Sequence, residues 1–307
     1  MKYFVIGFYV LLMNLSYAQL PNVCAGKLQR HENIISKFVT QRNVDVWLPV
    51  GYSATKKYVV LYMQDGQMLF DSNLTWNKSA WDVDDIISKL NSENKIRDVI
   101  VVAIWNGGTE RHSEYCPQKP FETLPALQQE GIMNSIRRDG SSVFNGFKVK
   151  SDNYLKFVIT ELKPFIDKTY STYSDKENTF ISGSSMGGLI SIYAICEYPE
   201  IFGGAACLST HWPVIFSIEN NPMPFTIFDY LKNNLPSAKS HKIYFDYGTE
   251  TLDKLYAPLQ LEVDELMIAK GYTTKNWMTK EFSGADHSEK AWHQRFDIPV
   301  LFLLRKE

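Results

Sequence analysis

Short runs of apolar, β-branched and aromatic residues recur along the chain, and polar turns or longer segments separate them. Runs of this length and composition are typical of buried β-strands. We predict strands over Arg42–Leu48, Tyr58–Met63, Val99–Ile104, Thr179–Gly183, Gly204–Leu208, Lys242–Asp246 and Trp277–Phe282.

Several of the intervening segments carry apolar residues every three or four positions, which is the repeat of an amphipathic helix. Segment 189–196 is almost wholly apolar, so its helix is predicted to be buried on all sides. Helices are predicted over Asp82–Leu90, Tyr154–Ile166, Leu189–Cys196, Phe225–Leu231, Leu259–Ala269 and Ser288–Leu304.

The alternation of strands and helices predicts an α/β fold with a mostly parallel central sheet and helices on both faces. We expect the first strands, which precede the first helix, to form an antiparallel edge. No repeat or linker divides the chain, so residues 19–307 are predicted to form a single domain. Two long connections, 106–151 and 209–240, leave the carboxyl ends of strands. Ligands bind at those ends in open α/β sheets, so both connections are candidate cleft walls.

The first 18 residues have the pattern of a secretory signal peptide. Lys2 precedes an apolar run from Tyr3 to Met13, and Ser16-Tyr17-Ala18 fits a cleavage site. The alternative is a membrane anchor, but the run is shorter than the ~20 residues that a span needs. We therefore predict a protein that is secreted or periplasmic, with no stable membrane association after the signal is removed.

Composition and charge indicate an ordinary globular protein and argue against nucleic-acid binding. The 307 residues include 32 Lys and Arg against 34 Asp and Glu, which gives a net charge of −2. Hydrophobic residues make up 45% and charged residues 21%, as in ordinary globular domains. Since phosphate binding needs clustered basic residues, a nucleic-acid partner is not expected. The sequence does not indicate an oligomeric state.

Four cysteines are too few for a disulfide scaffold in a chain of this length. No C-x-x-C motif is present, so neither a cysteine zinc site nor a redox site is expected. Cys196 and Cys207 are predicted to be core residues of a helix and a strand. An exported protein can form disulfides, which leaves a Cys24–Cys116 bridge open.

The strongest local signal is Gly183-Ser184-Ser185-Met186-Gly187, which fits the nucleophile elbow G-x-S-x-G. An apolar strand precedes it and a buried helix follows, as the elbow requires. The turn is so tight that the positions two before and two after the nucleophile have no room for a Cβ. Ser184 competes as nucleophile, but only Ser185 has glycine at both positions. Ser185 would stand at a helix N-terminus, and the next backbone N–H, of Met186, would stabilise an oxyanion.

A serine hydroxyl needs a base to act as a nucleophile. In proteins with this type of elbow, the three residues follow one another along the chain in the order serine, acid, histidine. His287, in Ser283-Gly284-Ala285-Asp286-His287, comes directly after the last strand and is the best placed of six histidines. The acid is expected in the loop after the strand that ends at Asp246. Asp253 is favoured there and Glu250 is the alternative, because either carboxylate could accept a hydrogen bond from the imidazole.

A second oxyanion donor is expected from the loop that follows Met63. In Gln64-Asp65-Gly66-Gln67, the glycine would let the backbone N–H of Gln67 face the cleft. The predicted mechanism is acyl transfer through a covalent intermediate on the serine.

These three motifs together resemble the "putative esterase" family, over about residues 44–304. The family includes enterochelin and feruloyl esterases, acetyl xylan esterases, S-formylglutathione hydrolase and mycolyltransferases. The resemblance implies an α/β-hydrolase fold and carboxylic-ester hydrolysis without a cofactor. From their positions in the motifs, the resemblance implies that Ser185 is the nucleophile and His287 is the base. Family members commonly place an Asp three residues after the glycine of the acid loop, where this chain has Thr251, and some siderophore esterases work with a Ser–His pair.

Export and aromatic-rich loops favour an acetyl or feruloyl ester linked to carbohydrate, with a siderophore lactone as second choice. A glutathione thioester is a cytosolic substrate and fits export poorly. Arg111, His211 and Trp212 lie in the two long connections and are candidates to line the substrate pocket, although loop packing explains them equally well.

Other activities on the same fold are an acyltransferase, a peptidase and a non-catalytic binding protein. The chain has no propeller-like domain to gate peptides, and it retains both nucleophile and base. No metal site is expected, because Asp82, Asp84 and Asp85 have the pattern of a solvated helix face.

Overall fold

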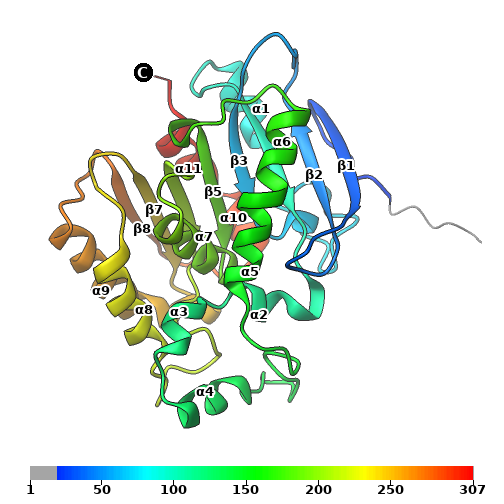
Figure 1. Ribbon diagram of the computed structural model, residues 1–307. Coiled ribbons are helices and arrows are strands. Elements are labelled where there is room, and N and C mark those ends of the chain that lie inside the picture. The colour runs from blue at the N-terminus through cyan, green and yellow to red at the C-terminus, as the bar shows by residue number, and fades with distance from the viewer. Residues whose placement is uncertain (1–18, 307) are drawn as a thin grey trace, which may run out of the picture.

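Eight strands form one open sheet in the computed structural model, which describes residues 19–306 (Figure 1). Their order is β1-β2-β4-β3-β5-β6-β7-β8. Strand β2 pairs antiparallel with β1 and β4, and every other pair is parallel. The strands are β1 (Lys27–Ile34), β2 (Arg42–Leu48), β3 (Val59–Met63), β4 (Val99–Ile104), β5 (Thr179–Ser184), β6 (Gly204–Leu208), β7 (Lys242–Gly248) and β8 (Trp277–Phe282).

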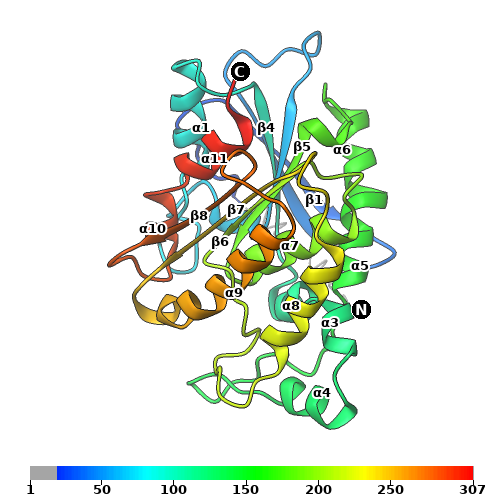
Figure 2. The ribbon, with the colours of Figure 1, turned by 90° about the vertical axis from the view of Figure 1, so that its left-hand side faces the viewer.

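Helices cover both faces of this sheet, as Figure 2 shows edge-on. One face carries α1 (Val83–Ser92), α10 (Glu289–His293) and α11 (Asp297–Leu304). The opposite face carries α5 (Ser151–Lys156), α6 (Lys163–Thr169), α7 (Met186–Glu197), α8 (Met223–Asn234) and α9 (Tyr256–Ala269). A π-helical stretch, η3 (Phe157–Leu162), joins α5 to α6. The short helices α2 (Arg111–Tyr115), α3 (Gln118–Glu122) and α4 (Ala126–Met133) lie within the connection after β4.

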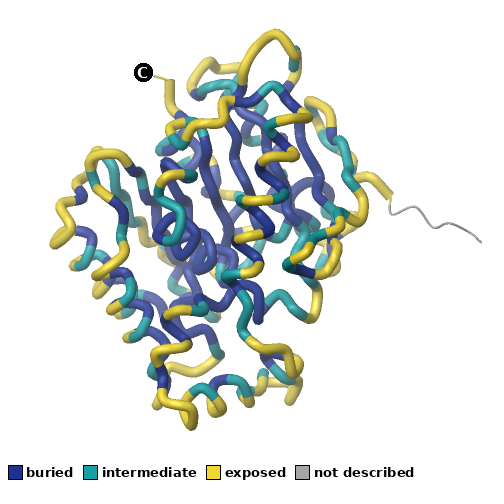
Figure 3. The backbone as a smooth tube through the Cα atoms, in the orientation of Figure 1, coloured by how far each residue is buried: buried dark blue, intermediate teal, exposed yellow. Residues whose placement is uncertain are grey.

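The central strands are apolar throughout because each contributes to two cores. Val60 and Tyr62 of β3 pack among the helices α5 to α9, whereas Leu61 and Met63 pack against α1 and α11. This division follows from the pleat, which turns successive side chains to opposite faces. The sheet and the inward faces of the helices are accordingly buried in Figure 3. The α/β fold predicted from the alternation of elements is confirmed.

Four predicted strands have the bounds of β2, β4, β6 and β8, but β1 was not predicted. Its residues are mostly polar and half-exposed, because it is an edge strand covered on one side only. The expected antiparallel edge is correct for β2 and wrong for β3. Strand β3 lies between β4 and β5 and pairs parallel with both.

The two long connections gather at the carboxyl ends of the parallel strands, where α2, α3, α4 and α8 lie at the bottom of Figure 1. These two connections, which were predicted as cleft walls, therefore lie at the same end of the sheet as the elbow. The predicted signal peptide, residues 1–18, lies outside the described residues. Between residues 19 and 306, no helix combines the length and the apolar character needed to cross a bilayer.

The suggested Cys24–Cys116 disulfide is wrong, because all four cysteines are free. Cys116 is buried in the core on the α5–α9 face. Cys24 is exposed and its backbone N–H donates to Asp84 at the start of α1, which covers the opposite face. The sheet therefore separates the two thiols. Cys196 and Cys207 are buried in α7 and β6, as predicted.

Candidate active site

Ser185 occupies the sharp turn between β5 and α7. Its φ is +57° and its ψ is −124°, a region that a residue with a side chain rarely adopts. Its backbone N–H donates to the carbonyl of Leu208 at the end of β6. A Cβ on Gly183 would lie 2.7 Å from the carbonyl carbon of Gly187, so the close approach in this turn requires glycine. The half-buried Ser185 is thus held at the tip of a central strand.

Backbone strain is concentrated around this turn. Non-glycine residues with positive φ follow four adjacent strands at their carboxyl ends: Asp65 after β3, Ser185 after β5, Ser209 after β6 and Thr251 after β7. Such conformations cost on the order of 1 kcal/mol or more each and persist only where the surrounding structure imposes them. Their clustering marks this edge of the sheet as a site whose geometry is held against local preference.

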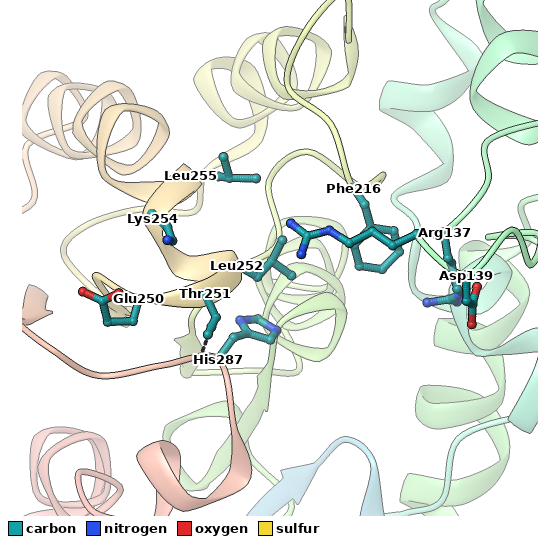
Figure 4. Close-up of a pocket in the computed structure, with 10 residues that line it drawn as sticks. Arg137, Asp139, Phe216, Glu250, Thr251, Leu252, Lys254, Leu255 and His287 are labelled. Atoms are coloured by element: carbon teal, nitrogen blue, oxygen red, sulfur yellow. Dashed lines mark hydrogen bonds between the residues drawn. The ribbon is translucent and has the colours of Figure 1, made fainter.

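His287 and Asp253 meet at the same edge. The Nδ1 atom of His287 lies 2.5 Å from Oδ1 of Asp253, which is fully buried. The backbone N–H of His287 donates to the Thr251 hydroxyl over 2.9 Å, which Figure 4 shows as a dashed line. Thr251 thus holds the backbone of the histidine, and Asp253, two residues later, reaches its ring.

Three further groups hold the Asp253 carboxylate. Its Oδ2 accepts hydrogen bonds of 2.6 Å from both the Ser209 hydroxyl and the Gly248 backbone N–H. The Arg295 guanidinium lies 3.9 Å away. Burial raises the pKa of Asp253, but the hydrogen bond and charge of His287, with those from Ser209 and Gly248, bring it below its usual value. Asp253 is therefore an anion at neutral pH.

The alternative acid does not contact the imidazole. Glu250 is exposed at the start of the 3₁₀ turn η5 (Thr251–Leu255), and its carboxylate points away from His287 in Figure 4. Asp246 is buried within β7 and accepts a 2.9 Å hydrogen bond from Arg295. Burial raises the pKa of Asp246 to about 6. Of these three carboxylates, only that of Asp253 hydrogen-bonds to His287.

The two predicted oxyanion donors lie on adjoining segments. Met186 is the first residue of α7, so its N–H has no acceptor within the helix. Gln67 lies in η1 (Gly66–Met68). Gln64, three residues before Gln67, donates its N–H to the carbonyl of Ser182 in β5 over 2.9 Å. A Cβ on Gly187 would lie 3.2 Å from the Asp65 carboxylate. The loop of Gln67 therefore packs directly against the elbow.

The three candidate substrate residues have different environments. Arg111 forms two hydrogen bonds to Asp65, of 2.6 and 2.7 Å. His211 is buried, and its Nδ1 lies 2.7 Å from the hydroxyl of Tyr256. Trp212 is a correction: its indole is fully buried between core aromatics and donates to Gln260, so it does not line the cleft.

Tyr256 is a site residue that the sequence did not reveal. Its hydroxyl lies 2.7 Å from Nδ1 of His211, and its ring packs edge-on against His287 at a centroid distance of 5.8 Å. Burial raises the pKa of Tyr256 well above its usual range, the charge of Asp253 raises it further, and the hydrogen bond with Ser185 lowers it. Tyr256 is thus a neutral phenol. Ser209 and Arg295 were missed too, because an isolated serine or arginine gives no local signal.

A cavity of about 860 Å³ opens beside His287 (Figure 4). Phe216, Leu252 and Leu255 give it an apolar part, and the guanidinium of Arg137 lies over the Phe216 ring at 5.2 Å. The charged residues that line it are Arg137, Arg138, Lys254, Asp139 and Glu250. Phe216 and the Arg137–Asp139 segment come from the two long connections, which confirms them as cleft walls.

The acidic start of α1 differs from the predicted solvated face. Asp84 is buried rather than solvated, because its carboxylate accepts the N–H of Cys24 over 2.6 Å. Ligand-type atoms of Cys24, Asp84 and Asp85 lie within 4.8 Å of one another. This cluster lies at the start of α1 and does not include the residues around Ser185.

Comparison with known proteins places the chain in a family. The family model described as "putative esterase" matches residues 35–301. The fold and the elbow are those of an α/β-hydrolase, and the chain belongs to the putative esterase family.

Relatives differ widely in length and sequence. The endo-1,4-beta-xylanase/feruloyl esterase of Xylanibacter ruminicola is 26% identical over 204 residues, which cover 63% of this chain and 23% of that one. The chain covers less than two thirds of the length of the curated relatives it matches. The ferulic acid esterase AmCE1/Fae1A of Anaeromyces mucronatus has a TM-score of 0.58 and 20% identity, over 91% of each chain. The enterobactin esterase of Shigella flexneri has a TM-score of 0.58 and 15% identity, over 92% of this chain and 60% of that one.

Proposed function

We propose that this protein is a serine carboxylic-ester hydrolase, with Ser185 as nucleophile, His287 as general base and Asp253 as the acid. The observation that carries the proposal is the 2.5 Å contact between His287 and Asp253, at the sheet edge where Ser185 occupies a strained elbow. Membership of the esterase family supports the same reaction.

In the first half of the reaction, the Ser185 hydroxyl attacks the ester carbonyl while its proton moves to Nε2 of His287. The Asp253 carboxylate stabilises the imidazolium through Nδ1–H. The carbonyl oxygen becomes an oxyanion and accepts hydrogen bonds from the backbone N–H groups of Met186 and Gln67. The C–O bond to the alcohol then breaks, and His287 returns the proton to the leaving alkoxide.

The second half repeats the sequence with water. His287 takes a proton from water, and the resulting hydroxide attacks the acyl-enzyme carbonyl. The bond to Ser185 Oγ breaks, and His287 gives the proton back to that oxygen. The acid product leaves, and no external cofactor is consumed in these steps.

A feruloyl or acetyl ester of carbohydrate is the proposed substrate class. The apolar part of the cavity, formed by Phe216, Leu252 and Leu255, suits an aromatic acyl group next to His287. The printed names of the Xylanibacter and Anaeromyces proteins include feruloyl or ferulic acid esterase, which supports this choice. Export, inferred from residues 1–18, would bring the protein to polymeric substrates.

A siderophore ester is the second candidate, and one observation favours it. Arg137, Arg138 and Lys254 line the cavity against two acidic residues. This excess of positive charge suits an anionic ligand, such as an iron–catecholate complex. The structural likeness to the Shigella enterobactin esterase is consistent with it.

The test compares residues 19–307 with a Ser185→Ala variant. Substrates are p-nitrophenyl acetate and butyrate, methyl ferulate, acetylated xylan and a ferric siderophore lactone. We expect wild-type turnover and a loss of at least about 10³-fold in the variant. Equal rates in the two proteins, or no turnover on any ester, would contradict the proposal. Product formed from an added alcohol in preference to acid would identify an acyltransferase instead.

A further inference from the structure

Behind the carboxylate of Asp253 lies a buried serine, Ser209, which takes no part in the steps of the proposed reaction. It directly follows β6 and is fully buried. We propose that Ser209 is a positioning residue, whose hydroxyl donates to Asp253 and thereby fixes which carboxylate oxygen faces His287. This inference rests on the proposed function of the site and adds to it the residue that sets the orientation of the acid.

Two groups that can only donate hydrogen bonds occupy the Ser209 oxygen. The indole Nε1–H of Trp292 donates to it over 3.0 Å, and Nη2 of Arg295 donates to it over 2.8 Å. A hydroxyl group has two acceptor lone pairs and one proton, whereas an indole N–H and a guanidinium accept nothing. Both lone pairs of Ser209 are therefore taken. Its proton is left for the remaining partner, Oδ2 of Asp253 at 2.6 Å.

Arg295 does not replace Ser209 as a partner of the acid. Its Nη2 atom carries two hydrogens. One is donated to Oδ1 of Asp246 over 2.9 Å and the other to Ser209, while Asp253 is too distant for a hydrogen bond at 3.9 Å. Asp246 also accepts the Tyr244 hydroxyl over 2.9 Å, which holds it within β7. The guanidinium thus fixes the Ser209 oxygen from a buried ion pair of its own.

The donors around Asp253 determine its charge and its orientation. Oδ2 accepts the Ser209 O–H and the Gly248 N–H, both over 2.6 Å, and Oδ1 is left for Nδ1 of His287 at 2.5 Å. Two hydrogen bonds to one carboxylate oxygen stabilise the ionised form. The proton between Asp253 and His287 is therefore assigned to Nδ1, which leaves Nε2 free to act as the base.

Ser209 consequently affects the transition state through Asp253. The imidazolium forms as Ser185 loses its proton, and the fixed carboxylate stabilises that charge. Without the Ser209 hydroxyl, Oδ2 would keep only the Gly248 N–H, and the carboxylate could rotate away from Nδ1. Substrate binding in the cavity does not involve Ser209, which is absent from its lining. The loss should therefore appear in kcat and not in KM.

Two substitutions remove the hydroxyl. Ser209→Ala leaves the other atoms in place. Ser209→Gly is expected to fold as well, because Ser209 has a φ of +42°, where glycine is not strained. We expect both variants to lower kcat on p-nitrophenyl butyrate by about tenfold to a hundredfold, as for a hydrogen bond to a charged group. KM should change less than about twofold.

Ser151→Ala is the matched control. Ser151 is also fully buried, but its hydroxyl accepts the backbone N–H of Gln118 over 2.9 Å, in the connection after β4. This variant should keep the wild-type kcat. Thermal unfolding of every variant shows whether it is folded.

Two further variants separate positioning from general packing. Adding Ser209→Gly to Asp253→Asn should change kcat less than about twofold, because a positioning residue acts only through its partner. Trp292→Phe removes the Nε1–H but keeps an aromatic ring beside His287, against which Trp292 packs edge-on at 5.0 Å. Arg295 still holds the Ser209 oxygen in that variant, so we expect kcat to fall less than about threefold.

A wild-type kcat in folded S209G would overturn the role of Ser209 and leave the proposed esterase intact. An undiminished effect of Ser209→Gly in the Asp253→Asn background, a raised KM with unchanged kcat, or an equal loss in W292F would do the same. A wild-type protein that hydrolyses no ester and is not labelled at Ser185 by a fluorophosphonate would contradict the proposed function itself. Lower kcat in both Ser209 variants, with no further loss in the Asp253→Asn background, supports the inference.

Discussion

The guanidinium of Arg111 donates two hydrogen bonds to the carboxylate of Asp65. Nε donates to Oδ1 over 2.6 Å, and Nη2 donates to Oδ2 over 2.7 Å. Asp65 has a φ of +56° and begins the short turn that carries Gln67. Asn106 donates to the same carboxylate over 2.7 Å. Two residues of the connection after β4 thus hold the proposed oxyanion loop in a conformation that its own backbone does not favour.

If Arg111 supports this loop, its loss should affect the transition state more than substrate binding. We expect Arg111→Gln and Asp65→Asn each to lower kcat about tenfold, with KM changed less than about threefold. The double variant should match the slower single variant, because the two residues act as one unit. Steady-state kinetics on p-nitrophenyl butyrate measure all three. A raised KM with unchanged kcat in R111Q alone would instead show that Arg111 binds substrate.

The acid of the proposed triad can be separated from its neighbour by matched amide substitutions. Asp253→Asn removes the charge that stabilises the imidazolium and favours the wrong histidine tautomer. We expect kcat to fall by about 10²- to 10⁴-fold. Glu250→Gln should stay within about twofold of wild type, since Glu250 is exposed and does not contact His287. Similar losses in both variants would contradict this assignment.

Cavity charge should influence which ester is preferred. We expect Arg137→Gln/Arg138→Gln to lower kcat/KM for an anionic ester, such as p-nitrophenyl hydrogen succinate, by three- to tenfold relative to p-nitrophenyl butyrate, as is usual for exposed charges. The wild-type preference should weaken as ionic strength rises. Lys270→Gln, an exposed lysine past the far end of α9, is the control. An unchanged ratio would argue against anionic substrates, including iron–siderophore complexes.

Two buried histidines make stability depend on pH. Burial lowers the pKa of His112 to about 3, and that of His211 lies well below its usual value. In the unfolded chain both bind protons below pH ~6.5, whereas the folded protein keeps them neutral. Unfolding therefore takes up protons, and stability falls as pH drops from about 6.5 towards 3. For His112 the loss can reach about 5 kcal/mol at the acid end.

His112→Gln tests this contribution, because the glutamine amide can still donate to the Val214 carbonyl that His112 Nε2 contacts at 2.5 Å. Thermal unfolding between pH 4 and 8 should show a shallower acid decline in H112Q than in wild type. Parallel pH profiles for the two proteins would show that His112 does not titrate on unfolding in this range.

Thiol chemistry provides a check on the fold. With Ellman's reagent and no reductant, the folded protein should react at Cys24 alone, since the other three cysteines are buried. That reaction should be slow, because partial desolvation of the sulfur and the neighbouring carboxylates of Asp85 and Asp84 raise the pKa of the Cys24 thiol, although the residue as a whole is exposed. Four thiols should react after denaturation. A count of two would show that a disulfide forms after all.

Local sequence patterns were sufficient to predict those features that depend on interactions between neighbouring residues. The central strands are apolar throughout because both faces of the sheet are covered, so their positions follow from composition alone. The elbow is visible because its turn excludes a Cβ at Gly183, which limits the residues that can stand there. Strand β1 was not predicted, because an edge strand does not need a continuous run of apolar residues.

Long-range contacts decided the rest. Glu250 and Asp253 lie in one loop with similar chemistry, and only the fold of η5 turns Asp253 inwards to His287, 34 positions later in the chain. Arg111 and Trp212 were both candidates to line the cleft. In the structure, Arg111 pairs with the Asp65 carboxylate, and Trp212 packs against aromatic rings in the core.

The sequence by itself therefore determined the fold class, the elbow and the region of the base, since periodicity and steric exclusion act over a few neighbouring residues. The tertiary structure decided which carboxylate reaches His287, what holds the oxyanion loop and that Tyr256 packs against His287. These pairings depend on the packing of side chains that are distant in sequence, and no local pattern encodes the direction in which a folded chain points them.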